Sequence, residues 1–515
     1  MKAINSHIWK RILFLALGFT ALASCSEDAM DRVNKDNDHT TSAPAKFVLA
    51  DVITSTAFSG VGGDLNTYFS VYTEHTVGID NQLYNAEIRD GEPSVSSTFN
   101  NVWGELYSTL KNARITILLA SNEVYANYTT RGMAEVLAAI SSGLITDAFG
   151  NTPYSQAALP ELENGRPKFM NPDIDAQEAI YQSIMKYLDD AIVDLPKGDV
   201  KDPVKEYDLL YKGDGKKWIK LAYGLKARYT MHLLARSQNR QADLQKVLEY
   251  VDKSFKSLDE QAAFSVYNKD NWNPLFAFFD SREALAASKS FWDKLVERKD
   301  PRLRRLFCNT DGVQIKGTDD KSLLMAPNGT ADPIRGHYNT PIFVYSRVCP
   351  TMLMSYHELL FLKAEALARL NKTAEAEAAL KEAIVAAIAN AELGVSAAIN
   401  VGVEKTSEAI TDKEAEEYFD KNVKPLFTAN PVREVMVQKY LAMLGAFGES
   451  TECYNDIRRM KALKEDFIKL DNPKPFPLRA PYGNSDVIAN PKVNAAYGDG
   501  QYVYSDPVWW AGGNR

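Results

Sequence analysis

Two stretches of the chain place aromatic residues among amides and arginines. They cover residues 68–89 (YFSVYTEHTVGIDNQLYNAEIR) and residues 267–282 (YNKDNWNPLFAFFDSR). Aromatic rings can stack on the flat apolar face of a sugar, while amides and guanidinium groups hydrogen-bond the hydroxyls around its rim. We therefore expect a ligand of that kind to be bound by these side chains: Tyr72, Asn81, Gln82, Tyr84 and Arg89 from the first stretch, and Tyr267, Asn271, Trp272, Asn273 and Arg282 from the second, with Tyr338 added.

Trp272 is the strongest single candidate of this set, because it stands among polar residues. Each aromatic residue also has a second interpretation, in which it packs into the core or against a loop. Trp103 and Trp218 fall in amphipathic segments, so we expect them in the core. Trp509 and Trp510 stand at the C-terminal end, and we expect them to hold that end against the body.

The best match to a catalytic motif is HELLF at residues 357–361. In HExxH, two histidines four residues apart bind zinc and the glutamate is the general base. Phe361 stands where the second histidine is needed, so the motif is incomplete. We expect Glu358 and Glu365 to pair instead with Arg or Lys across the interface of a helical hairpin. A pair of glycosidase carboxylates is defined by its distance in space, so the sequence leaves that alternative open.

An acidic loop over residues 311–321 carries Asp311, Asp319 and Asp320. It lacks the alternating oxygen ligands of an EF-hand. No cofactor is predicted, and a structural calcium ion in this loop stays an open alternative.

The elements that position these residues are predicted to be mostly helices. After residue 47, apolar residues recur over much of the chain at the intervals of three and four that are typical of amphipathic helices. Residues 264–348 are rich in Asn, Asp, Gly and Pro, which predicts long ordered loops with one short helix at residues 288–298. From residue 472 onward we expect coil. The predicted helices cover residues 101–122, 133–144, 177–195, 218–236, 244–258, 355–370, 373–391, 412–422, 432–447 and 453–470.

The N-terminal segment has the features of a lipoprotein export signal. Lys2, Lys10 and Arg11 precede an apolar run over residues 12–22 that is too short to span a bilayer comfortably. Small residues then lead into Cys25, as in a bacterial lipobox, where the cysteine is acylated and the segment before it is removed. An ordinary secretory signal with a chance cysteine is the alternative. The predicted organisation is a signal peptide at residues 1–24, a lipidated Cys25 with a flexible acidic tether at residues 25–45, and a single domain at residues 46–515.

The composition is that of an ordinary folded protein with an acidic balance: 45% of the residues are apolar and the formal net charge is -8. Such a chain lacks the basic patch with which proteins bind nucleic acids, so nucleic acid is not an expected partner. We find no later apolar run long enough for a membrane helix, so attachment through the lipid alone is expected. Outside the cytoplasm Cys308 and Cys349 could form a disulfide; in the alternative they stay free and buried, together with Cys453.

Short motifs in a fixed order run from the lipobox to the C-terminus. No motif is decisive alone, but the ordered set resembles the SusD/RagB family of outer-membrane nutrient-binding lipoproteins. The motifs are DAFGNTPY at residues 147–154, QEAIY at 177–181, YKGD at 211–214, DPRL at 300–303, YHELLFLKAE at 356–365, QKY at 438–440, NDIRR at 455–459, PY at 481–482, NP at 490–491 and WW at 509–510.

This resemblance implies a mostly α fold, in which tetratricopeptide-like helical hairpins pack against a loop-rich variable half. The hairpin predicted at residues 355–391 resembles one such unit. The resemblance also implies an outer-membrane, lipid-anchored protein that faces the cell exterior. Such a protein binds a glycan or a peptide nutrient and acts as the lid of a SusC-like TonB-dependent transporter. It is a binding protein rather than an enzyme. A lipid-anchored surface hydrolase and an adhesion protein are the competing hypotheses.

Overall fold

Helices form most of the backbone in the computed structural model, which describes residues 43–514 apart from residues 95, 97, 123 and 125. The prediction of a mostly helical fold is thereby confirmed. The predicted signal peptide, Cys25 and the tether up to residue 42 lie outside the described residues.

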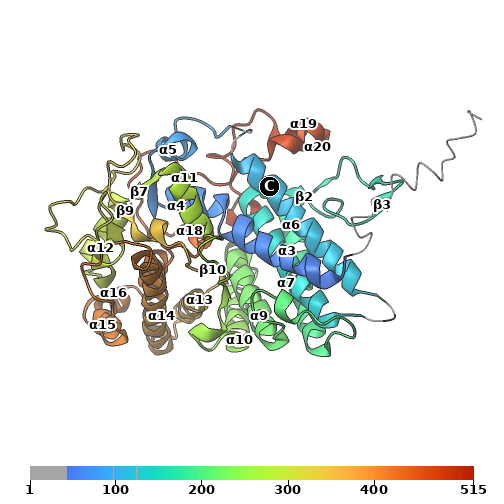
Figure 1. Cartoon of the computed structure of the whole chain (residues 1–515), viewed down its shortest axis with the longest axis horizontal. Coiled ribbons are helices and arrows are strands. Elements are labelled where there is room, and N and C mark those ends of the chain that lie inside the picture. Colours follow the sequence, from blue (N-terminus) through green and yellow to red (C-terminus); the bar gives the residue numbers. More distant parts are fainter. Residues whose placement is uncertain (1–42, 95, 97, 123, 125, 515) are drawn as a thin grey trace, which may run out of the picture. The chain divides into compact units, whose positions relative to one another are not determined.

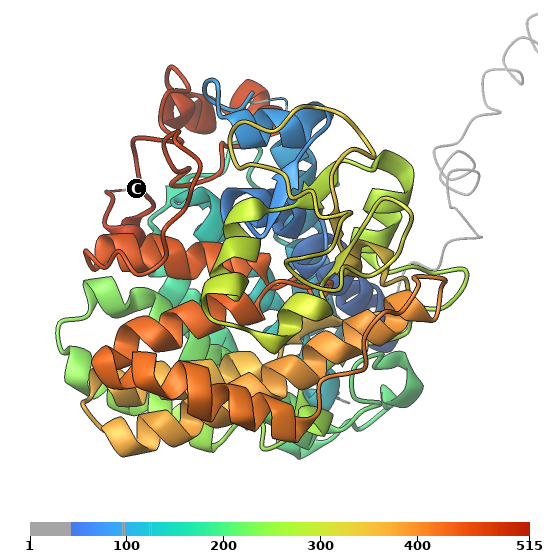
Figure 2. The ribbon, with the colours of Figure 1, turned by 90° about the vertical axis from the view of Figure 1, so that its left-hand side faces the viewer.

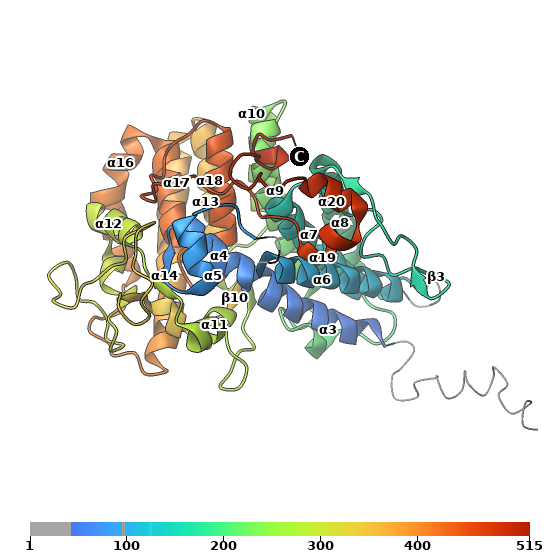
Figure 3. The ribbon, with the colours of Figure 1, turned by 90° about the horizontal axis from the view of Figure 1, so that it is seen from above.

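The long helices follow one another as a continuous array. Each packs on the next in the order α6, α7, α8, α9, α10 and α13, and α13 then packs on both α14 and α17 (Figures 1 and 3). The helices α13 and α14 form the predicted antiparallel hairpin, turned at residues 370–372. Their bounds are α6 Thr98–Ala120, α7 Tyr128–Phe149, α8 Gln177–Asp194, α9 Gly215–His232, α10 Arg240–Asp252, α13 Tyr356–Arg369, α14 Thr373–Ile399, α17 Pro431–Ala442 and α18 Ser450–Ala462.

Shorter helices and loops complete the described chain. In Figures 1 and 2, α4, α5, α11, α19 and α20 lie above the long helices α9, α10, α13 and α14. Of these, α4, α5 and α11 carry the candidate binding residues Tyr72, Asn81, Gln82, Tyr84 and Arg282. The bounds are α3 Ala45–Ser55, α4 Asp64–Tyr72, α5 Asn81–Ile88, α11 Pro274–Arg282, α12 Lys289–Glu297, α15 Asp412–Tyr418, α16 Lys424–Ala429, α19 Asn484–Ala489 and α20 Pro491–Tyr497.

The strands of the described residues are short and pair antiparallel, two by two. Apart from the local hairpin of β3 and β4, they join segments that are separated in sequence, rather than building a sheet with a face of its own. The pairs are β1 Thr76–Gly78 with β7 Leu285–Ala287, β2 Thr152–Pro153 with β5 Ile174–Asp175, β3 Leu162–Glu163 with β4 Arg166–Pro167, β6 Ala262–Phe264 with β10 Thr351–Met354, and β8 Phe307–Cys308 with β9 Thr340–Pro341.

Polar side chains begin several of the helices. The Asp214 carboxylate accepts a hydrogen bond from the Lys216 backbone N–H at 3.0 Å, at the start of α9. The Ser355 hydroxyl accepts one from the Glu358 N–H at 3.1 Å, at the start of α13. The first N–H groups of a helix have no partner within the helix, so these side chains fix where it begins.

The helix α11 corrects one sequence-based expectation, because residues 274–282 were predicted to be loop. Its apolar run, LFAFF, shows no helical alternation with polar residues. The start signal is nevertheless present: the Asn273 side chain accepts a hydrogen bond from the Leu275 N–H at 2.9 Å, and Pro274 occupies the first turn. The helix predicted nearby at residues 288–298 is confirmed as α12.

Two further segments contain more helix than the sequence predicts. The helix α14 continues to Ile399, eight residues past the predicted end. Its Gly394 lies against the Phe343 ring, where a Cβ atom would come within 2.7 Å of the ring, so only glycine permits this approach. The tail after residue 472, predicted as coil, contains the short helices α19 and α20.

The long helices and the shorter helices share one extended apolar core. Trp103 and Trp218 are fully buried in it, as predicted. The C-terminal tryptophans hold the chain end as predicted. Trp510 stacks on His232 with 5.6 Å between ring centroids. The Trp509 carbonyl accepts a hydrogen bond from Arg236 Nε at 2.7 Å.

Two helices of the described chain are long and apolar enough, by length and composition, to cross a membrane. They are α7 and α14, in contrast to the expectation that no apolar run after the N-terminal segment is long enough. In α7 94% of the most apolar window is buried inside the fold, and in α14 56% is buried. A buried core helix meets the same criterion, and α7 fits that description.

Ion pairs cross the helix interfaces inside this core. Glu358 accepts two hydrogen bonds from Arg228 at 2.7 and 2.5 Å. Glu365 pairs with Arg459 at 2.5 and 2.8 Å and with Arg369 at 2.7 Å. Both glutamates pair with arginines, as predicted, but the partners lie on α9, α18 and α13 itself rather than across the α13–α14 hairpin. Glu358 is thus engaged rather than poised for catalysis.

The three cysteines of the described chain are free and buried. This is the second of the two alternatives for Cys308, Cys349 and Cys453. Burial raises the pKa of the Cys308 thiol to about 12, so it stays protonated and unreactive at neutral pH.

Candidate ligand-binding site

The short ladder between β1 and β7 brings the two predicted binding stretches together. Gly78 pairs with Leu285, so the start of α5 lies beside the end of α11. Glycine is required at position 78, because a Cβ atom there would lie 2.0 Å from the Leu83 carbonyl oxygen. Glycine therefore lets α5 fold back against its own strand.

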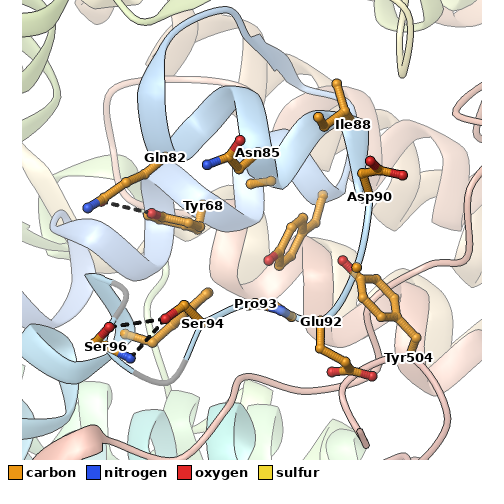
Figure 4. Close-up of a pocket in the computed structure, with 14 residues that line it drawn as sticks. Tyr68, Gln82, Asn85, Ile88, Asp90, Glu92, Pro93, Ser94, Ser96 and Tyr504 are labelled. Carbon is orange, nitrogen blue, oxygen red and sulfur yellow. Dashed lines mark hydrogen bonds between the residues drawn. The ribbon is translucent and has the colours of Figure 1, made fainter. Parts of the chain in front are cut away.

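A pocket of about 400 Å³ opens beside α5, and we call it the tyrosine pocket. Figure 4 shows Asn85 and Ile88 on α5 above it, the loop with Pro93 and Ser94 below, and Tyr68 and Tyr504 at opposite sides. A volume of this size, with apolar walls and a few polar groups, is typical of small-molecule sites. The residues that line it and are used below are Tyr68, Tyr72, Gln82, Asp90, Glu92, Phe99 and Tyr504.

A second pocket of about 420 Å³ adjoins the first, and we call it the Arg282 pocket. The two share Tyr68 and Gln82, whose side chains are joined by a hydrogen bond of 3.1 Å. They therefore form neighbouring parts of one groove. The Arg282 pocket is the more polar, and it is lined by Asp64, Asp80, Asn81, Asn101, Phe278, Ser281 and Arg282.

The C-terminal tail closes one side of the tyrosine pocket. Glu92 accepts a hydrogen bond from the Val503 backbone N–H at 3.0 Å, next to Tyr504. Burial raises the pKa of the Glu92 carboxyl, although hydrogen bonds from the tail backbone oppose this. Burial likewise raises the pKa of Tyr504 to about 12, so its hydroxyl stays neutral and can donate a hydrogen bond. Tyr504 is half-buried, which leaves part of its ring accessible.

In the Arg282 pocket the carboxyl of Asp64 is strongly perturbed. Burial raises its pKa to about 6, with Glu105 adding to the rise and Arg282 opposing it. Burial also raises the pKa of Glu105. Asp64 therefore changes from acceptor to donor in mildly acidic solution, within reach of a bound polar ligand.

The structure brings four of the predicted residues into the groove. Tyr72 and Gln82 line the tyrosine pocket, and Asn81, Gln82 and Arg282 line the Arg282 pocket. Tyr84, Asn271 and Trp272 line neither pocket. The indole N–H of Trp272 donates to the Lys269 carbonyl at 2.8 Å, and its ring stands edge-on to Phe276. A ligand contact for these three residues stays a prediction.

The remaining predicted residues are buried and serve the fold. The Tyr267 hydroxyl lies 2.7 Å from the Thr351 hydroxyl. Asn273 caps α11 and also donates to the carbonyls of Cys349 and Ala446, at 2.9 and 3.0 Å. Tyr338 accepts a hydrogen bond from the Asp332 N–H at 3.1 Å.

Arg89, the last residue of the first stretch, is only 4% exposed and lies behind the tyrosine pocket. It donates to the Tyr72 carbonyl at 3.2 Å.

Several pocket residues were missed in the sequence. Tyr68 stands in the first stretch but was not singled out. Glu92 and Phe99 follow it in the chain, and Tyr504 lies some 400 residues away in a tyrosine-rich tail. The signal for Tyr504 was its residue type, but nothing in the sequence places residue 504 beside residue 92.

The acidic loop does not gather a metal site in the residues that the structure describes. No group of three or more His, Cys, Asp or Glu side chains there could hold a metal ion. Asp320 instead accepts hydrogen bonds from the backbone N–H groups of Lys316 and Ser322, both at 2.9 Å. Its oxygens thus stabilise the loop turn.

Comparison with known proteins identifies the family to which this chain belongs. A family model described as starch-binding, associating with the outer membrane, matches residues 36–482. A SusD/RagB family protein from Bacteroides thetaiotaomicron is 54% identical, with a TM-score of 0.87, over 92% of this chain and 100% of its own. No curated protein is detectably similar to the sequence.

Two more distant solved structures share the fold. One is a chitin-binding protein, 22% identical with a TM-score of 0.68, covering 90% of this chain and 99% of its own. The other is a SusD homolog from Bacteroides fragilis, 19% identical with a TM-score of 0.70, covering 92% of this chain and 100% of its own.

The fold and these matches define a binding protein, not an enzyme. The chain belongs to the SusD-like family, as its ordered motifs predicted, and that family associates with the outer membrane.

Proposed function

We propose that this chain is a cell-surface lipoprotein that binds a neutral oligosaccharide along the groove formed by the tyrosine pocket and the Arg282 pocket. It then delivers the oligosaccharide to a SusC-like TonB-dependent transporter in the outer membrane, for which it acts as the lid. The observation that carries the proposal is the groove itself, where a half-buried Tyr504 faces Tyr68 across a cavity with amides and carboxylates at its rim.

The groove suits a sugar in both chemistry and extent. Tyr504 offers an accessible aromatic face, and the hydroxyls of Tyr68 and Tyr504 stand beside it. Gln82, Asn85 and Asn81 offer amides that can both donate and accept. Because the two pockets adjoin, a ligand of several rings can occupy both.

The charge of the groove favours a neutral ligand. Asp90 and Glu92 line the tyrosine pocket, and Asp64 and Asp80 line the Arg282 pocket, where Asp80 is paired with the exposed Arg335. Arg282 is the one basic side chain among the described residues that line these two pockets. A chain of uronic acids or sulfated sugars would be repelled by this lining.

The anchor and the lid role rest on the sequence and on the family. The lipobox at Cys25 would attach the protein to the membrane, and the acidic tether at residues 26–45 would leave the folded domain free to move over a transporter. A family described as associating with the outer membrane supports this placement.

Binding is tested by calorimetric titration of the full chain, in a neutral detergent, against a panel of neutral oligosaccharides and peptides. Tyr504→Ala is expected to weaken the best oligosaccharide by about 1 kcal/mol, roughly five-fold in Kd. Tyr223→Ala is the matched control, since Tyr223 is half-buried on α9 and lines neither pocket. An equal loss in both variants, or a peptide as the only ligand, would contradict the assignment.

The transporter partnership is tested by extraction from membranes in mild detergent. A large barrel protein is expected to co-purify with the wild-type chain, and Cys25→Ser should reduce nutrient uptake because the lid is then released. A protein that purifies alone, or uptake unchanged by the substitution, would refute the lid role.

A further inference from the structure

A third pocket, of opposite charge, lies on the other side of Arg89. It has a volume of about 400 Å³ and is formed by the end of α18 and the segment that follows, residues 463–476. We call it the Arg89 pocket. Its basic residues are Arg89, Lys461, Lys469 and Lys474, and Phe476 adds an aromatic face.

Arg89 is a buried cation with incomplete partners. One of its terminal nitrogens donates to the Tyr72 carbonyl at 3.2 Å, and the other donates weakly to the Pro475 carbonyl at 3.5 Å. Its Nε has no hydrogen-bond partner in the described chain. No described carboxylate lies within salt-bridge distance of this guanidinium, although the buried Glu87 carboxyl interacts with it at longer range. A buried cation without a directly paired carboxylate is costly, so this position favours an anion.

Two of the three lysines of the pocket have no acidic partner in the described chain. Lys461 lies 5.1 Å from the Phe476 ring centroid, and within the described residues neither it nor Lys469 forms a salt bridge. Lys474 forms an exposed ion pair with Asp90 at 3.7 Å.

The carboxylates that face the pocket do not fill this need. Both oxygens of Glu465 bind Arg369, at 2.7 Å each. Asp466 and Asp471 are exposed at the rim. The pocket therefore presents more positive than negative charge, in contrast to the acidic groove on the other side of Arg89.

We propose that the Arg89 pocket binds the anionic group of an acidic saccharide, a carboxylate or a sulfate ester, with the sugar ring against Phe476. The anion meets Arg89 at the floor and the lysines at the rim. This site is separate from the neutral-sugar groove, and it does not rest on the proposed function of that groove.

The test is titration of the full chain in neutral detergent with glucuronate, glucose 6-sulfate, glucose and inorganic sulfate. Glucuronate and glucose 6-sulfate are expected to bind at least ten-fold more tightly than glucose or inorganic sulfate. Added salt is expected to weaken this binding, because the rim lysines are exposed to screening. Equal affinity for glucuronate and glucose would overturn the anion assignment. Equal affinity for inorganic sulfate would overturn the saccharide assignment.

Substitutions test whether glucuronate binds in the Arg89 pocket. The double change Lys461→Gln and Lys469→Gln, at two exposed positions, should weaken glucuronate at least ten-fold. The matched control is Lys216→Gln with Lys413→Gln, which removes the same charge from exposed positions that do not line the pocket. Arg89→Met should abolish binding in protein that retains wild-type circular dichroism. Loss in the control, or none in the rim variant, would refute the proposed site.

Discussion

At the scale of single residues, burial decides which polar side chains can meet a ligand. Trp272 and Asn273 are neighbours in the sequence, yet Asn273 is fully buried and bonded to three backbone groups, whereas Trp272 is half-buried. Residue type therefore nominates candidates but does not separate a capping amide from a binding amide.

Asp64 provides a residue-scale prediction. Its folded-state pKa, about 6, lies above the ordinary value of 3.8, so the fold favours the protonated form. The stability from this group is fully present below about pH 4 and is lost as the pH rises through 6. Asp64→Asn should remove this contribution to the pH dependence of the free energy of unfolding, which is at most about 3 kcal/mol.

Urea unfolding of the wild type and of Asp64→Asn, compared across that pH window, checks the Asp64 prediction. The difference between the two free energies of unfolding is the quantity to follow, since other carboxyls titrate in the same range. A difference that stays constant from pH 4 to about pH 7 would show that Asp64 titrates normally.

At the scale of elements, the tail is part of the site because Glu92 holds it. Glu92 can act without contacting a ligand, because the hydrogen bond that it accepts from the Val503 N–H helps to place Tyr504 at the pocket. The same logic applies to the β1–β7 ladder, which carries Arg282 to the start of α5.

A double-mutant cycle tests this positioning role. Glu92→Ala should weaken oligosaccharide binding about as much as Tyr504→Ala does, roughly five-fold. If Glu92 acts through Tyr504, the double variant should be no weaker than Tyr504→Ala alone. Additive losses would instead mean that Glu92 contacts the ligand itself. The control is Glu408→Ala, at an exposed position that lines neither pocket.

At the scale of the whole molecule, buried charges tie distant segments together. His232 at the end of α9 lies 2.8 Å from Glu452 of α18 and 3.3 Å from Asp147 of α7. Burial alone would lower the pKa of His232, but the two carboxylates outweigh it and raise this pKa to about 9. One imidazolium thus joins three helices, with Trp510 of the tail stacked on it.

This linkage predicts a loss of stability in alkaline solution. The contribution of His232 is fully present below about pH 6.5 and is lost as the pH rises through 9, a change of roughly 3 kcal/mol at most. Thermal unfolding between these pH values should show a falling Tm for the wild type and a flatter profile for His232→Gln.

His75 supplies the matched control for His232. It is equally buried, but burial lowers its pKa to about 3, so it is neutral throughout this range. His75→Gln should therefore shift Tm without changing its slope against pH. A wild-type slope retained in His232→Gln would contradict the predicted linkage.

Much of the fold was predictable because local patterns specify helices. The array from α6 to α18 follows apolar periodicity, caps and prolines, each of which acts within a few residues. The error at α11 arose where an apolar run has no polar partner face, so periodicity is silent and only Asn273 and Pro274 mark the start.

What the sequence determined by itself was the class of protein, through ordered motifs, and the region of the groove, through Tyr72, Asn81, Gln82 and Arg282. Only the tertiary structure decided which aromatic rings reach the groove. Tyr504 comes to it from the far end of the chain, where Glu92 accepts a hydrogen bond from the neighbouring Val503 N–H, and Arg89 lines a different pocket of opposite charge. The physical reason is that a binding site is an arrangement of side chains in space, and its longest-range contacts leave no periodic trace in the sequence.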